Sequence, residues 1–176
     1  RSQAGTPGRE GLLDVARRAD ADPWRNRLRE ALVSQEKEVL LELARDESVP
    51  SQPPADVLLL GRALRQLDEV STAVQVLERA QAERPGDFWL NITLGYTLED
   101  PDPPRAIAFY RAALALRPTS LAAYLGLGNC FLWREKFHEA IAAYRRGIEF
   151  HPAEAKFRIN LGIALGKLGR FDEEIA

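Results

Sequence analysis

The strongest constraint on the fold of this chain is a repeat of 33 or 34 residues. Glycine, alanine and proline keep this interval independently in three series: Gly61, Gly95, Gly128 and Gly162; Ala73, Ala106 and Ala140; and Pro85, Pro118 and Pro152. A period of this length is typical of stacked helix–turn–helix units, each of which buries its apolar face only against its neighbours. The sequence therefore predicts an all-α repeat protein.

Residues 121–152 show one such unit clearly. Leu127 and Phe131 fall on one face of a first predicted helix, and Ala140 and Tyr144 fall on one face of a second. Pro152 then ends the second helix, because proline lacks the backbone N–H that a helix interior needs. Small residues at the crossing, here glycine and alanine, allow the paired helices to approach closely.

The period divides most of the chain into repeats. The predicted segments are a linker or tail (residues 1–21), an N-terminal helical hairpin (22–53), three repeats (54–87, 88–120 and 121–154) and a partial fourth repeat (155–176). The hairpin lacks the glycine and alanine positions, so it is interpreted as a degenerate repeat or a cap. Asp22 and Pro23 predict its start, because aspartate caps helices and proline suits the first helical position. A second helix is expected over 35–45, and the one-residue deletion of the second repeat is expected in its middle turn, 99–104.

Composition excludes several classes of function. The 176 residues are 45% apolar and 28% charged with a net charge of -2, so no excess of positive charge favours nucleic acid or an anionic membrane surface. The uncharged apolar runs are shorter than the roughly 20 residues that span a bilayer. The single cysteine, Cys130, cannot form an internal disulfide, which favours a cytoplasmic setting. There is no methionine, even at position 1, so we expect the sequence to be part of a longer chain.

The pattern within the repeats resembles the tetratricopeptide repeat (TPR) family. Repeat three carries the family's large, small and aromatic positions at Tyr124, Leu127, Gly128, Phe131, Ala140, Tyr144 and Pro152, with Gly147 where alanine is usual. The resemblance covers residues 54–176. It implies a right-handed α-solenoid whose first helices line a concave groove that holds an extended peptide or a partner helix.

The resemblance also assigns residues to this groove. The candidates are Arg62, Trp89, Tyr96, Asn129, Trp133 and Lys156, and the same positions of the partial repeat include Ile159 and Ile163. Aromatic residues are favoured anchors at interfaces, whereas the alternative is that the aromatic candidates pack on neighbouring helices; both interpretations stay open. Some TPR domains clamp a C-terminal carboxylate, but only Asn129 and Lys156 fit that clamp, so a chaperone tail is not the expected ligand. Of the asparagine ladder of some long arrays, only Asn160 is present.

No combination of residues indicates catalysis or a bound cofactor. Gly126-Leu127-Gly128 has no preceding strand, and its last glycine belongs to the repeat period, so a nucleotide-binding loop is not predicted. His138 and His151 lack acidic or cysteine partners at metal-ligand spacing. No histidine lies at helical spacing from Cys130, which is predicted to be a buried, inert thiol. We therefore predict a non-enzymatic segment without cofactor or metal.

A second resemblance concerns the context of the repeats. Residues 11–32 and 84–91 are similar to the region that follows the catalytic domain in certain large bacterial serine/threonine protein kinases, although the chain itself holds no kinase motif. The hypothesis is a protein–protein interaction scaffold that forms the regulatory or docking part of such a kinase. The rival hypotheses are the TPR part of another enzyme, such as a glycosyltransferase, and a self-assembling structural array.

Overall fold

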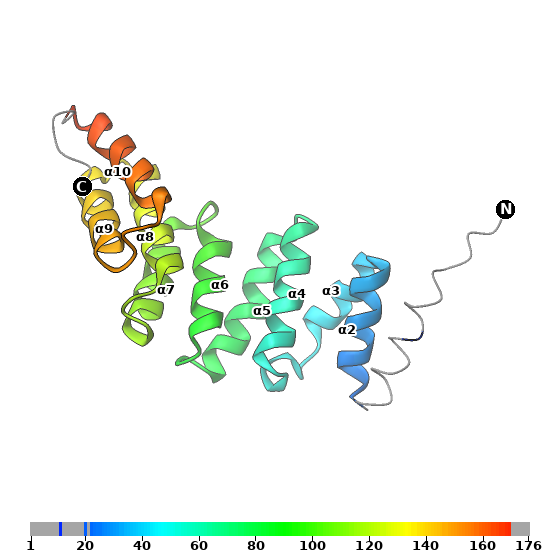
Figure 1. Cartoon of the computed structure of the whole chain (residues 1–176). Helices are drawn as coiled ribbons and strands as arrows, with labels where there is room; N and C mark the ends of the chain where they lie inside the picture. Colours follow the sequence, from blue (N-terminus) through cyan, green and yellow to red (C-terminus); the bar gives the residue numbers. More distant parts are fainter. Residues whose placement is uncertain (1–10, 12–19, 21, 170–176) are drawn as a thin grey trace. The chain divides into compact units, whose positions relative to one another are not determined.

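The structure is a computed structural model that describes residue 11, residue 20 and residues 22–169. The elements that it bounds are all helical, and none of the described residues forms a strand. They are α2 (Pro23–Ser34), α3 (Lys37–Arg45), the 3-10 turn η1 (Val49–Ser51), α4 (Pro54–Gln66), α5 (Val70–Glu83), α6 (Phe88–Leu98), α7 (Pro103–Leu116), α8 (Leu121–Trp133), α9 (Phe137–Phe150) and α10 (Ala155–Lys167) (Figure 1). Among the described helices, none is both long and apolar enough to cross a membrane. The linker or tail predicted over 1–21 falls almost wholly outside the described residues, as do residues 170–176 of the partial repeat.

The starts of the helices repeat the period of the sequence. Successive first helices α4, α6, α8 and α10 begin at intervals of 34, 33 and 34 residues, at Pro54, Phe88, Leu121 and Ala155. Along the C-terminal part of the chain each helix packs on the next, from α6 through α7, α8 and α9 to α10. The chain divides into two compact units, residues 1–80 and residues 81–176, and the boundary lies inside α5.

In the N-terminal unit, α2 and α3 form a hairpin that packs on α4. The Asp22 side chain accepts a hydrogen bond from the backbone N–H of Arg25 at 2.9 Å, and Pro23 lies in the first turn, which confirms the predicted helix start. Trp24 is buried, and its indole N–H donates to the carbonyl oxygen of Leu43 at 3.3 Å. The hairpin is therefore joined by a polar contact as well as by its apolar core.

The second helix of the hairpin begins later than predicted. α3 starts at Lys37 rather than at Gln35, because Gln35 has a φ of 57° and ends α2 in the left-handed conformation. A residue in that conformation cannot continue a right-handed helix. The position of the boundary is thus decided by the backbone of one residue, which the apolar pattern of the helices does not encode.

The residue that is missing from the second repeat is lost from a helix, so the prediction of a shortened turn was wrong. α6 has 11 residues, whereas α4 and α8 have 13 each. The connection from α6 to α7, residues 99–102, is longer than the connection from α8 to α9, residues 134–136. Pro101 explains the early end of α6, because the residue before a proline is disfavoured in the helical conformation.

Small residues in the C-terminal unit leave room for rings from the helix packed against them. A Cβ atom at Gly128 of α8 would lie less than 3.0 Å from the ring of Tyr144 in α9. Ala140 of α9 is fully buried at the same crossing position of the repeat. Gly147 stands where the family usually has alanine, and the ring of Phe157 from α10 occupies the space that a methyl group would need. The departure from the family pattern therefore compensates for a large neighbour.

Candidate peptide-binding surface

The six candidates predicted from the sequence divide between the two units. Arg62 lies on α4 in the N-terminal unit, where it is exposed. The other five lie in the C-terminal unit: Trp89, Tyr96 and Trp133, which are 55%, 50% and 57% exposed, Lys156, which is exposed, and Asn129, which is half-buried. The structure therefore brings five of the six into one compact unit and leaves Arg62 in the other.

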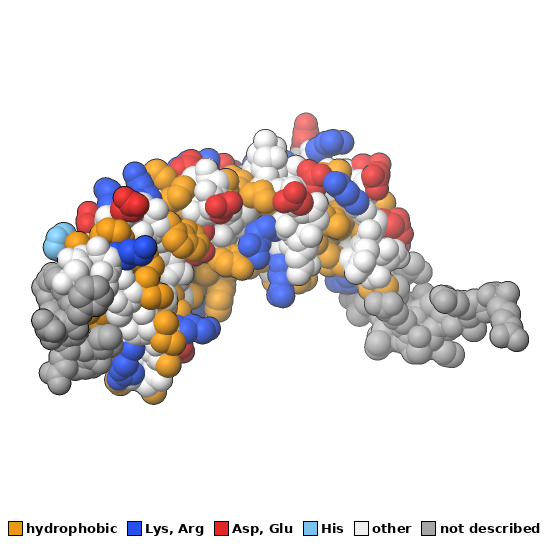
Figure 2. Space-filling view, turned by 90° about the horizontal axis from the view of Figure 1, so that it is seen from above, with side chains coloured by type: hydrophobic (Ala, Val, Ile, Leu, Met, Phe, Trp, Pro, Cys, Tyr) orange, Lys and Arg blue, Asp and Glu red, His pale blue; other side chains and the backbone are white. Residues whose placement is uncertain are grey.

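Exposed apolar side chains gather on the first helices of the C-terminal unit. We name the following five the apolar face: Trp89, Tyr96, Trp133, Ile159 and Ile163. They come from α6, α8 and α10, and α8 contacts both of the other helices. Neither α6 nor α8 contains a charged residue, whereas an ordinary surface helix is polar on its outer side. Figure 2 shows hydrophobic side chains on the surface of this unit, at the left of the view, between charged ones. Exposed apolar patches of this kind mark interaction sites.

Trp89 is held in place by its neighbours and is still half exposed. Its ring meets the ring of Phe88 edge-on, with the centroids 5.1 Å apart and an interplanar angle of 75°. Cζ of Arg117 lies 5.3 Å from the centroid of the Trp89 ring and 4.1 Å from the centroid of the Phe88 ring. These are the distances of a cation–π contact. Packing and exposure, which the sequence analysis treated as alternatives, occur together at this residue.

Two asparagines connect α8 and α10. The side-chain oxygen of Asn129 accepts hydrogen bonds from the hydroxyl of Tyr144 at 2.9 Å and from Nδ2 of Asn160 at 3.0 Å. Among the residues that the structure describes, none bonds to Nδ2 of Asn129 or to Oδ1 of Asn160. One amide thus retains its donors and the other its acceptor, which is the combination that a peptide main chain complements.

Two buried tyrosines hold polar groups of the first helices. The hydroxyl of Tyr144 donates to Asn129, and the hydroxyl of Tyr110 donates to Glu99 at the end of α6. Burial raises the pKa of both hydroxyls above the usual value of 10.0. Both therefore stay protonated at neutral pH and act as permanent donors. This orientation of Asn129 could not be read from the sequence, because it depends on a tyrosine 15 residues away.

The remaining titratable groups do not form a catalytic or metal-binding cluster. Cys130 is fully buried, which confirms the prediction of a buried thiol, and burial raises its pKa to about 12. Thiols with a raised pKa are poor nucleophiles. Within the described ranges, no three side chains of His, Cys, Asp or Glu gather where they could hold a metal ion. Nε2 of His151 lies 2.6 Å from the carbonyl oxygen of Thr119, so the chain itself contacts this ring.

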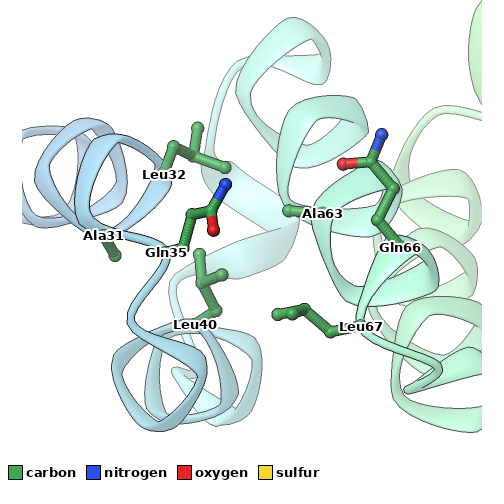
Figure 3. A pocket seen from close by; sticks show the side chains of 7 residues that line it. All are labelled: Ala31, Leu32, Gln35, Leu40, Ala63, Gln66 and Leu67. Carbon is green, nitrogen blue, oxygen red and sulfur yellow. The ribbon is translucent and has the colours of Figure 1, made fainter.

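The N-terminal unit contains a half-open cavity of about 240 Å³. Figure 3 shows its lining from α2, α3 and α4 and their ends: Ala31, Leu32, Gln35, Leu40, Ala63, Gln66 and Leu67. The polar side chains of this lining are the amides of two glutamines, and Arg62 does not belong to it. Such a lining can accept an apolar side chain but supplies no general acid or base.

Comparison with known proteins identifies the repeats. Models of the tetratricopeptide repeat match residues 57–87, 97–149 and 132–176. Over 80 residues, which are 46% of this chain, the sequence is 35% identical to the peroxisomal targeting signal receptor of Eremothecium gossypii, and the match spans only 14% of that receptor.

Solved structures show the same fold. A fragment of MamA from Desulfovibrio magneticus RS-1 superposes with a TM-score of 0.70 at 23% identity, over 84% of this chain and 85% of that one. A crystal structure of the MamA protein superposes with a TM-score of 0.73 at 18% identity, over 85% and 82% of the two chains. The all-α fold predicted from the period is confirmed. The chain therefore contains a tetratricopeptide repeat domain and has the all-α solenoid fold of that family.

Proposed function

We propose that this chain is a protein-interaction scaffold that binds a peptide or a helix of a partner on the apolar face. The observation that carries the proposal is the exposure of Trp89, Tyr96 and Trp133 by half or more on adjacent helices. Burying one large apolar side chain stabilises a complex by about 1.5–3 kcal/mol. Aromatic residues also lose little conformational entropy on binding and often dominate the energy of an interface.

The asparagine pair supports a peptide as the class of ligand. A bound segment would offer its main-chain carbonyl oxygen to Nδ2 of Asn129 and its N–H to Oδ1 of Asn160. The partial relative from Eremothecium gossypii is named as a receptor for a targeting signal. We take from it only the expectation that a linear segment of a protein is the ligand.

The experiment is selection of peptides from a random dodecamer library displayed on phage, using the purified chain as bait. The double variant Trp89→Ala, Trp133→Ala removes two anchors and is expected to weaken binding of the selected peptides at least tenfold. Leu116→Ala is the matched control, because Leu116 is also exposed, at 41%, but lies on the second helix α7. Circular dichroism establishes that each variant is folded. Equal binding by wild type and a folded double variant would remove the apolar face from the proposal.

The wider context is part of the same proposal. The similarity of residues 11–32 and 84–91 to the region after a kinase domain supports a regulatory or docking role in a larger bacterial serine/threonine kinase, in the cytoplasm. The parent gene tests this role. A glycine-rich loop and the His-Arg-Asp and Asp-Phe-Gly motifs upstream of Arg1 are expected. Glycosyltransferase motifs in their place would favour the rival enzyme, in which this domain would still be a binding module.

Self-association is a second candidate function. Ile159 and Ile163 on α10, the last helix that the structure describes, are 61% and 46% exposed. Two copies could bury these side chains against one another. Light scattering over a concentration series from 1 to about 100 μM, a range in which weak homodimers form, measures the mass. A constant monomer mass would contradict self-association and leave peptide binding untouched.

A further inference from the structure

Arg117 is an exposed cation beside the apolar face. It lies in the connection between α7 and α8, and its guanidinium is within 4.1 Å of the centroid of Phe88 and 5.3 Å of that of Trp89. Phe88 is buried, so it supplies a fixed surface for the guanidinium. Because the side chain is already held by two rings, less conformational entropy is lost when it binds a ligand.

The charge of Arg117 is not neutralised by the chain. Among the described residues, no carboxylate pairs with Arg117, whereas Arg105 pairs with Asp102 at 3.7 Å and Arg146 pairs with Glu149. The carboxylates at the starts of α6 and α10 are used as helix caps. The N–H groups of the Arg117 guanidinium therefore remain available. A guanidinium matches a carboxylate through two parallel hydrogen bonds, which makes an acidic side chain its preferred partner.

We infer that Arg117 binds an aspartate or glutamate of the peptide whose apolar side chains lie on the apolar face. This inference rests on the proposed function and specifies its ligand. Since α6 and α8 carry no charge, the preference for charge beside Trp89 comes from Arg117. Lys156 at the start of α10 is a second exposed cation of the same sign. The partner is therefore a segment of another protein that has a large apolar residue with an acidic residue near it.

The experiment uses the dodecamers selected as described above. The peptide that binds most tightly and its variant with glutamine in place of the acidic residue are synthesised with a fluorescent label. Fluorescence anisotropy gives the Kd of both for wild type, Arg117→Ala and Arg111→Ala. Arg111 is the matched control, because its Cζ also lies over a ring, 6.0 Å from the centroid of Phe131, but it belongs to the second helix α7.

The inference predicts that the acidic peptide binds wild type about threefold to tenfold more tightly than its glutamine variant, the range of an exposed to well-aligned ion pair. In Arg117→Ala the two peptides should bind equally, and in Arg111→Ala the difference should persist. Selected peptides that depend on Trp89 and Trp133 but not on the acidic residue would overturn the inference and leave the proposed function standing. Failure of any peptide to distinguish wild type from the tryptophan double variant would overturn both.

Discussion

Gly126 and Gly128 stand two residues apart in α8, and each leaves room for the ring of a different tyrosine. A Cβ atom at Gly128 would lie less than 3.0 Å from Tyr144, and one at Gly126 would lie less than 3.0 Å from Tyr110. The glycine-rich sequence that superficially suggests a phosphate loop is thus a packing surface on which two aromatic rings lie. The repeat period accounts for the first of these contacts, but Gly126 lies off the period and only the structure explains it.

The contact predicts that Gly126→Ala destabilises the protein. The ring of Tyr110 is buried and its hydroxyl is bonded to Glu99, so it cannot move away freely. Overpacking a core costs about 1–3 kcal/mol, and the gain in helix propensity returns only about 1 kcal/mol. We expect a net loss of about 1–2 kcal/mol in the free energy of urea unfolding. Gly86→Ala is the control, because a Cβ there meets no atom within 4 Å; equal stability of the two variants would contradict the account.

At the scale of elements, the N-terminal hairpin is attached to the first repeat by polar contacts. Arg79 of α5 donates from Nη1 to the carbonyl oxygen of Ala44 at 3.0 Å and from Nη2 to that of Asp46 at 2.7 Å, and so caps the end of α3. Lys37 at the start of α3 forms an ion pair with Glu69. A cation at a helix C-terminus bonds the carbonyl groups that the helix leaves unsatisfied and interacts favourably with its dipole.

Arg79→Ala is expected to destabilise the protein by about 1–2 kcal/mol, because two bonds from a charged donor are lost and only one of them is exposed. Arg79→Lys should recover part of the loss, since it keeps the charge but not the two-pronged geometry. Arg27→Ala serves for comparison, because Arg27 makes an exposed ion pair with Glu42, which is worth little. Thermal unfolding of the three variants measures the effect, and equal losses in Arg79→Ala and Arg27→Ala would refute a capping role.

At the scale of the whole molecule, the buried ionisable groups make stability depend on alkaline pH. Burial raises the pKa of Cys130 from 9.0 to about 12, and it raises the pKa of Tyr110 and of Tyr144 from 10.0. In the unfolded chain these groups lose their protons at lower pH than in the folded chain. Above pH 9 the unfolded state therefore binds fewer protons, and the free energy of unfolding falls as pH rises.

The urea midpoint should accordingly be constant up to about pH 8 and then decrease steadily between pH 9 and 11. The contribution of Cys130 is fully present below pH 9 and is lost as pH rises toward 12. In Cys130→Ala the decrease between pH 9 and 10 should be smaller than in wild type, since the tyrosines begin to ionise only near 10.0. A wild-type midpoint that does not change up to pH 11 would show that these groups are not buried as described.

Local and periodic information in the sequence determined the class of this protein. The 33- or 34-residue period predicted the paired helices and the close crossing at Gly128, Asp22 and Pro23 predicted a helix start, and the single cysteine was predicted to be buried. Each of these features depends on residues within one repeat or on a spacing that recurs. The aromatic candidates for the binding surface were also found in this way, although their exposure was left open.

Only the tertiary structure decided the contacts on which the candidate site is built. Asn129 meets Asn160 from 31 residues away, and Arg117 reaches Phe88 and Trp89 from the far end of its own repeat. The early end of α6 and the late start of α3 depend likewise on a proline and on a left-handed residue in the connections. Periodicity specifies which side of a helix is buried, because burial averages over many side chains. A single hydrogen bond or ring contact depends on how two particular side chains are oriented across the packed helices, and this orientation follows only from the folded chain.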